Sequence, residues 1–121
     1  MDIAEKNVRA VVQHYLEGMV YGDAERLELA FHPQAQIAGH WEGTYEIIAR
    51  DPFITTCVDA KDQAAGTAIV AAIVSVDITA DVAVVKLTDT CFGCDFTDYL
   101  SLVNHNEQWQ IISKVYYVHS S

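Results

Sequence analysis

Hydrophobic residues near the N-terminus recur with the spacing of one helix face. They fall three or four positions apart, and charged or amide side chains occupy the opposite side; the apolar positions are Val8, Val11, Val12, Tyr15, Leu16 and Met19. This period predicts an amphipathic helix whose stripe faces a core. Gly22 can adopt the left-handed conformation that ends a helix, and Asp23 can cap the next one. A second helix is expected over about residues 24–31, stopping at His32 because Pro33 disfavours helical geometry before it.

After this point the pattern changes to short strands, expected over residues 35–41 and 44–50. Asp51 as the N-cap and Pro52 as the first helical residue predict a short third helix. Four further strands separated by short turns are expected over residues 67–79, 82–91, 94–103 and 108–118. The longest apolar run, residues 68–76, is rich in β-branched side chains and is interpreted as a buried strand. Helices first and an antiparallel meander afterwards indicate an α+β fold.

A two-residue turn gives the register of the first hairpin. If residues 92–93, Phe-Gly, form that turn, Cys91 faces Cys94. Alternate residues of both strands then share one face, which is apolar except for Asp89 and Asp98. The other face is largely polar, so the carboxyl groups are predicted to lie on the buried side of the sheet.

The next turn is less constrained. If residues 104–107 form a four-residue loop, the last strand adds five side chains to the buried face: Trp109, Ile111, Ser113, Val115 and Tyr117. Ser113 would then lie opposite Asp98. A slip of one residue would instead bring Lys114 inside and give Asp98 a cation.

Composition and charge narrow the possible partners. The 121 residues are 51% hydrophobic, enough for one folded domain over residues 1–121. Seven basic and seventeen acidic residues give a formal charge of −10, which repels nucleic-acid phosphates and anionic membranes, so neither is an expected partner. The N-terminus is charged from Asp2, unlike a signal peptide, and no apolar run is long enough to span a membrane. A cytoplasmic location is expected.

The three cysteines are Cys57, Cys91 and Cys94. Their odd number argues against a disulfide framework. The CFGC spacing matches a redox or zinc pair, but zinc needs about four ligands and no second pair is present. Buried apolar thiols are the favoured interpretation.

Two stretches resemble a known superfamily over nearly the whole chain. VVQHYLEGMVYGDAERLELAFHPQAQIAG and DYLSLVNHNEQWQIISKVYY are similar to nuclear-transport-factor-two-like proteins, closest to the bacterial lumazine-binding (polyketide-cyclase-like) branch. The resemblance implies a cone: a strongly curved, mostly antiparallel sheet wrapped around three helices, open at one end. It also implies a homodimer formed through the sheet. The superfamily contains isomerases, cyclases, dehydratases, transport factors and pocket proteins, so it leaves the chemistry open.

Asp98 is the first candidate for acid–base chemistry. Burial disfavours a charged carboxyl and raises its pKa, which suits proton transfer near neutral pH. Asp89 is its diagonal neighbour in this register, and two close carboxyls tend to share a proton. The resemblance adds that isomerases use pocket aspartates and a tyrosine to move protons beside a carbonyl, which matches Asp98 and, loosely, Tyr15. The alternative is a structural aspartate bonded to Ser113, Tyr15 or backbone amides.

Inward aromatic residues favour a pocket for a small apolar or aromatic molecule, although the same side chains would also fill a core. The side chains expected to contact that molecule are Phe31, His32, Trp41, Phe53, Asp89, Phe96, Trp109, Ser113 and Tyr117. The chain lacks a GxSxG motif, a glycine-rich phosphate loop and a metal-type cluster of His, Asp and Glu. No cofactor or metal is therefore expected.

Three functions stay open on the sequence. The first is a homodimeric pocket protein that binds a small organic molecule. The second is a cofactor-free isomerase, cyclase or dehydratase, with Asp98 as acid or base and Tyr15 polarising the substrate. The third is an interaction module that uses the polar sheet face, formed by Thr88, Thr90, Thr97, Tyr99 and Ser101.

Overall fold

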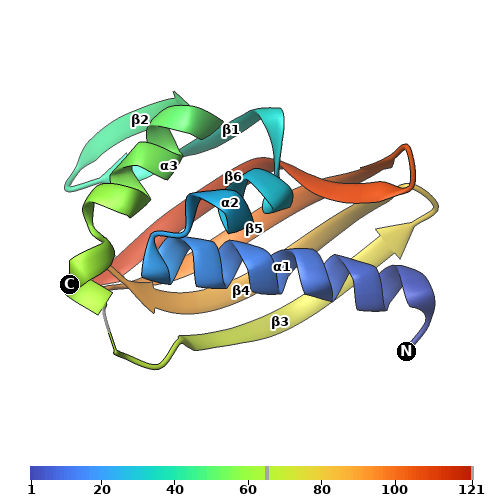
Figure 1. Ribbon diagram of the computed structural model, residues 1–121, viewed down its shortest axis with the longest axis horizontal. Coiled ribbons are helices and arrows are strands. Elements are labelled where there is room, and N and C mark those ends of the chain that lie inside the picture. Colours follow the sequence, from blue (N-terminus) through green and yellow to red (C-terminus); the bar gives the residue numbers. More distant parts are fainter. Residues whose placement is uncertain (65, 121) are drawn as a thin grey trace.

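Helices cover one face of a curved sheet in the computed structural model, which describes residues 1–64 and 66–120 (Figure 1). The helical elements of this part of the chain are α1 (Ile3–Tyr21), α2 (Ala24–Ala30), α3 (Arg50–Asp59) and a 3₁₀ turn, η1 (Lys61–Ala64). The strands are β1 (Phe31–Trp41), β2 (Thr44–Ala49), β3 (Val70–Thr79), β4 (Val82–Cys91), β5 (Cys94–His105) and β6 (Gln108–Ser120).

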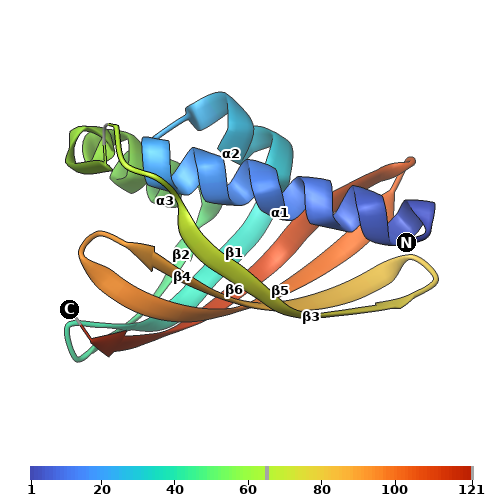
Figure 2. The ribbon, with the colours of Figure 1, turned by 90° about the horizontal axis from the view of Figure 1, so that it is seen from below.

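The six strands form one sheet in the order β2-β1-β6-β5-β4-β3. Only the β1–β6 pair among these is parallel, and the other neighbours run antiparallel. Seen from below, the sheet curves under the three α-helices (Figure 2). The predicted α+β class and mostly antiparallel, curved sheet are confirmed.

The helix boundaries follow from capping, with two corrections. Asp2 caps α1 and Gly22 ends it with a φ of 65°, as the sequence indicates. The helix α2 ends at Ala30 rather than at His32, because Phe31 already pairs with β6. The third helix starts at Arg50 with Ala49 as its N-cap, so the prediction that Asp51 caps it is wrong.

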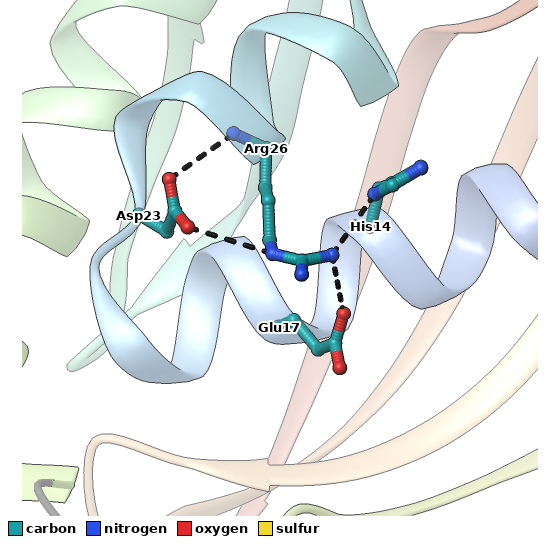
Figure 3. Close-up of polar contacts among 4 residues, drawn as sticks. All are labelled: His14, Glu17, Asp23 and Arg26. Atoms are coloured by element: carbon teal, nitrogen blue, oxygen red, sulfur yellow. Dashed lines mark hydrogen bonds and ion pairs between the residues drawn. The ribbon is translucent and has the colours of Figure 1, made fainter.

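A charged cluster joins α1 to α2 (Figure 3). The guanidinium of Arg26 lies 2.6 Å from Glu17 and 3.1 Å from the Nδ1 atom of His14, both on α1. Its Nε atom lies 3.5 Å from Asp23, which also accepts a hydrogen bond from the Arg26 amide. These contacts hold the two helices together at their shared turn.

The apolar run at residues 68–76 does not form a buried strand. It supplies most of β3, which lies at the edge of the sheet and leaves Val70 and Val74 exposed. The prediction was wrong because β-branched residues suit an exposed edge strand as well as a central one. Within the described residues, no helix is long and apolar enough to cross a membrane.

The first hairpin has the predicted register. Cys91 pairs with Cys94 across a turn in which Phe92 and Gly93 both have positive φ, the type that suits a two-residue hairpin. The predicted inward residues of β4 and β5 are all buried, including Asp89 and Asp98. The three cysteines are free and buried.

The second hairpin differs from its prediction in two ways. Its turn has two residues rather than four, since His105 pairs with Gln108, and this change preserves the faces. A β-bulge then reverses them: Leu102 pairs with Ile111 but Ser101 pairs with Ser113, so Ile112 has no residue opposite it on β5.

From Ser113 to Val118, the side chains of β6 lie on the face opposite to the predicted one. The prediction that Ser113 faces Asp98 is wrong, because Asp98 pairs with Tyr116. Tyr117 is 63% exposed rather than inward, and Val115 is also exposed. Lys114 and Tyr116 are buried in their place. The inward lysine matches the alternative that a one-residue slip would produce, although the slip occurs at a bulge and not at the turn.

Candidate functional site

A pocket of about 490 Å³ lies between the helices and the sheet. Side chains from α1, α3, η1, four strands and the β4–β5 turn form it: Met19, Ile37, Trp41, Glu46, Ile48, Phe53, Thr56, Gln63, Phe92, Phe96, Lys114 and Tyr116. Its volume falls in the range of about 300–1,000 Å³ that is usual for small-molecule sites.

Aromatic rings form much of the pocket wall. The ring of Trp41 stacks on that of Phe96 with an interplanar angle of 5° and a centroid distance of 6.0 Å. Phe92 packs edge-to-face with Trp41, and Tyr116 packs edge-to-face with Phe96. This set of rings offers flat apolar surface to a planar ligand.

Lys114 is the cation of the pocket. Its side chain is only 4% exposed, because β6 carries it inward after the bulge. The Nζ atom lies 4.6 Å from the ring centroid of Phe53, 5.0 Å from that of Tyr15 and 5.5 Å from that of Tyr116. It donates to the sulfur of Met19 at 3.6 Å. In residues 1–64 and 66–120, no carboxylate lies within 4.0 Å of Nζ.

The buried acids lie behind this lysine. The Tyr15 hydroxyl donates a hydrogen bond of 2.6 Å to Oδ2 of Asp98, and both residues are 0% exposed. Burial first, then the charges of Asp98 and Asp89, raise the pKa of Tyr15 well above its usual value. Tyr15 therefore stays protonated and acts as the donor of this bond.

Asp89 is the second buried acid. Burial, followed by the neighbouring carboxyl of Asp98, raises the pKa of Asp89 to about 8, although the charge of Lys114 lowers it. Within the described chain, no hydrogen-bond donor of the protein reaches either Asp89 carboxyl oxygen or Oδ1 of Asp98. A proton retained on Asp89 near neutral pH keeps these two buried groups from both carrying a charge.

A second polar pair lies at the pocket wall. The hydroxyl of Tyr116 donates a 2.6 Å hydrogen bond to Oε1 of Glu46 on β2. Burial first, and then this bond, raise the pKa of Tyr116. The ring lies against β1 at Gly39, where an added Cβ would come within 2.8 Å of it. A glycine there allows Tyr116 to approach the strand.

The thiols take no part in this polar arrangement. Burial raises the pKa of Cys57 to about 12 and that of Cys91 to about 11. Both groups are therefore neutral near physiological pH, and neither supplies a thiolate nucleophile. In the described part of the chain, no group of three or more His, Cys, Asp or Glu side chains could hold a metal ion.

The structure brings together only part of the predicted site. Trp41, Phe53 and Phe96 line the pocket, as expected from their inward positions. The acidic pair and Tyr15 are buried behind its wall rather than exposed to it. Their roles in binding or catalysis stay predictions.

The remaining predicted contacts lie away from the pocket wall. Phe31 is buried against the edges of Phe53 and Tyr15, and Trp109 is buried near the second turn. His32 accepts a hydrogen bond from the Gln34 amide and does not line the cavity. The bulge turns the side chains of Ser113 and Tyr117 to the outer face.

Among the lining residues that sequence reasoning missed are Glu46 and Tyr116, and it held Lys114 only as an alternative. The pairing of β1 with both β2 and β6 brings Glu46 and Tyr116 together across two strands. The alternation of side chains between the two faces of residues 44–49 predicts that Glu46 shares a face with Ile48. It does not predict that Glu46 contacts Tyr116.

The fold and pocket define a nuclear-transport-factor-two-like protein. A protein of this type and of unknown function from Silicibacter pomeroyi DSS-3 is 36% identical, with a TM-score of 0.91 over 98% of this chain and all of that one. A second, from Shewanella baltica OS155, is 24% identical, with a TM-score of 0.80 over 100% of this chain and 99% of the other.

Within that class, the chain belongs to the family described as "Putative lumazine-binding", whose model matches residues 4–117. The chain is also 31% identical over 114 residues to a protein named Aldolase FrzH from a Cladobotryum species. That match covers 91% of this chain and 87% of the relative.

The raised pKa of Asp89 predicts a pH-dependent stability. Its pKa rises from 3.8 to about 8 on folding, so the folded state binds the proton more tightly than the unfolded state. The resulting stabilisation is complete below about pH 4 and is lost as the pH rises toward about 8. Asp89→Asn should therefore gain stability relative to the wild type over this range, by at most about 1.4 kcal/mol per pH unit.

Urea unfolding followed by circular dichroism across this pH range measures the difference. Asp77→Asn, on the exposed part of β3, is the matched control and should run parallel to the wild type. A constant difference between Asp89→Asn and the wild type at every pH would contradict the raised pKa of Asp89.

Proposed function

We propose that the protein binds a small, largely aromatic molecule that carries a carbonyl or carboxylate oxygen, and that Lys114 contacts this oxygen. The observation that carries the proposal is the position of Nζ: it lies at the wall of an aromatic pocket with no carboxylate of the described chain within 4.0 Å. A buried cation without an ion-pair partner favours a ligand that brings an electron-rich oxygen.

The pocket wall supports an aromatic ligand in particular. The stacked rings of Trp41 and Phe96 and the nearby ring of Phe53 give flat contact surfaces. The pocket wall has few polar side chains, and Glu46 and Thr56 are among them. A small number of polar groups in an apolar wall orients a ligand rather than solvating it. The family description, which names lumazine, agrees with a planar ligand bearing ring carbonyls.

A second candidate function is carbon–carbon bond chemistry on a carbonyl substrate. The similarity to a protein named as an aldolase supports it, as does the raised pKa of the buried Asp89. Because Asp98 and Tyr15 are fully buried behind the pocket, their part would be to position and balance the charge of Lys114 rather than to touch the substrate.

We also propose that the protein is a homodimer formed through the outer face of its sheet. The bulge turns Val115 and Tyr117 outward, beside exposed Val84 and Tyr99 of the neighbouring strands. Apolar side chains grouped on an exposed face are typical of an interface. The threonine-rich surface expected from the sequence lies on the same outer face, on β4 and β5.

Lys114→Met should weaken the binding of oxygen-bearing aromatic ligands by about tenfold or more, since it removes the charge but keeps most of the side-chain volume. Quenching of tryptophan fluorescence on titration with 2-naphthoate, 2-acetonaphthone and lumazine measures this change. Naphthalene, which lacks the oxygen, should bind both proteins with similar affinity.

Lys86→Met is the matched control for that titration. Lys86 also lies on the sheet over a tyrosine ring, at 5.5 Å from Tyr99, but on the outer face. Its loss should leave binding unchanged. Equal affinities of wild type and Lys114→Met for all oxygen-bearing ligands, or no binding of any of them, would refute the proposed function.

If the protein is a homodimer, its mass in solution should be twice the mass of the chain. Size-exclusion chromatography with light scattering measures this mass. Val115→Glu, at the centre of the outer face, should give monomers because it buries a charge in the interface. Val70→Glu, which changes a more exposed valine on the edge strand β3, should remain dimeric. A monomeric wild type would exclude the dimer.

A further inference from the structure

We propose that Lys114 is a nucleophile that forms an imine with an aldehyde or ketone bound in the pocket, and that Glu46 is the base that removes a proton from the carbon next to the imine. This inference rests on the proposed function, since it assigns the carbonyl class of ligand to the same pocket.

The surroundings of Nζ suit an attacking amine. A surface lysine is held as an ammonium ion by water and by carboxylates, and this removes the lone pair needed for attack. Lys114 is nearly fully buried and has ring faces and the sulfur of Met19 around it. Within the described residues no carboxylate lies beside Nζ, and the side chain lines the space in which a carbonyl compound would bind.

The ring faces also suit the product of the attack. An iminium ion carries a positive charge at the position of the original ammonium, so the faces of Tyr15, Phe53 and Tyr116 remain in contact with a cation after the reaction. The pocket therefore holds the charge of the intermediate without rearranging its wall.

Imine formation consumes only the lysine amine and the carbonyl compound, and it releases water. Nζ releases one proton to pocket water, and its lone pair adds to the carbonyl carbon. A second N–H proton moves to the former carbonyl oxygen, and a proton from solvent lets that oxygen leave as water. The bond between Nζ and the ligand is then a C=N⁺ double bond.

Glu46 supplies the next step. Its carboxyl accepts the Tyr116 hydroxyl and lines the same pocket as Lys114. It takes a proton from the carbon beside the iminium, and the C–H electron pair moves toward nitrogen to give a neutral enamine. The enamine carbon can attack a second aldehyde, and water then hydrolyses the new iminium to return Lys114. The reverse sequence cleaves the same bond.

The other lysines do not share this environment. Lys6 lies on α1 and Lys61 on η1, and both are exposed; Lys86 projects from the outer face of the sheet. The chain thus provides three internal comparisons for the reactivity of Lys114.

Reductive trapping tests the imine directly. Wild-type protein is incubated with 2-naphthaldehyde and sodium cyanoborohydride, and the adducts are located by peptide mass spectrometry. We expect one dominant adduct, on Lys114, formed about tenfold or more faster than on any other amine. Lys114→Met should lose this adduct, and Lys86→Met should keep it.

The base is tested by a separate reaction. Wild-type protein in D₂O should exchange the methyl protons of 2-acetonaphthone, because the enamine takes up deuterium. Glu46→Gln should slow this exchange by about tenfold or more while the naphthaldehyde adduct still forms on Lys114. Glu28→Gln, which makes the same change on the exposed side of α2 away from the pocket, should exchange at nearly the wild-type rate.

Two results would overturn the inference. Adducts spread evenly over Lys6, Lys61, Lys86 and the N-terminus, with none preferred at Lys114, would show that the amine is not a nucleophile. Exchange unchanged in Glu46→Gln would remove the base. If 2-naphthoate still binds in a Lys114-dependent way in either case, the proposed binding function stands and only the covalent step fails.

Discussion

The arrangement of the pocket depends on one extra residue in β6. Ile112 has no residue opposite it on β5, so the strand changes face between Ile111 and Ser113. The change brings Lys114 and Tyr116 into the pocket and turns Val115 and Tyr117 outward. A single bulge therefore supplies both the pocket cation and part of the apolar outer face, and the two proposed properties of the protein have a common structural origin.

Burying the Lys114 ammonium is costly, by several kcal/mol when it has no partner. Three aromatic faces, each contributing about 0.5–2 kcal/mol, offset part of that cost. Behind them, Tyr15 orients Asp98, and Asp89 keeps a proton near neutral pH. The buried acids thus avoid placing two full negative charges side by side. A buried lysine beside two buried carboxyl groups is more readily explained by a role in binding or chemistry than by a contribution to the stability of the fold.

The parts of the fold that depend on residues close together in the sequence were predicted correctly. The period of α1, its glycine end and the Phe92-Gly93 turn gave the right helix and the right hairpin, and hence the buried position of Asp98. The bulge was not predictable, because Ile111 and Ile112 are equally suited to a buried face and either register leaves an apolar side. The Glu46–Tyr116 pair depends on β1 lying between β2 and β6, which residue spacing does not encode.

NMR of the lysine side chains tests most directly whether Lys114 points into the pocket. In protein labelled with ¹³C at its four lysines, Lys6, Lys61, Lys86 and Lys114, the ε-methylene protons report on nearby rings. We predict that one lysine shows a strong upfield ring-current shift and nuclear Overhauser contacts to the rings of Tyr15 and Phe53, and that Lys114→Met removes this signal. Four lysines with solvent-like shifts and no aromatic contacts would contradict the account.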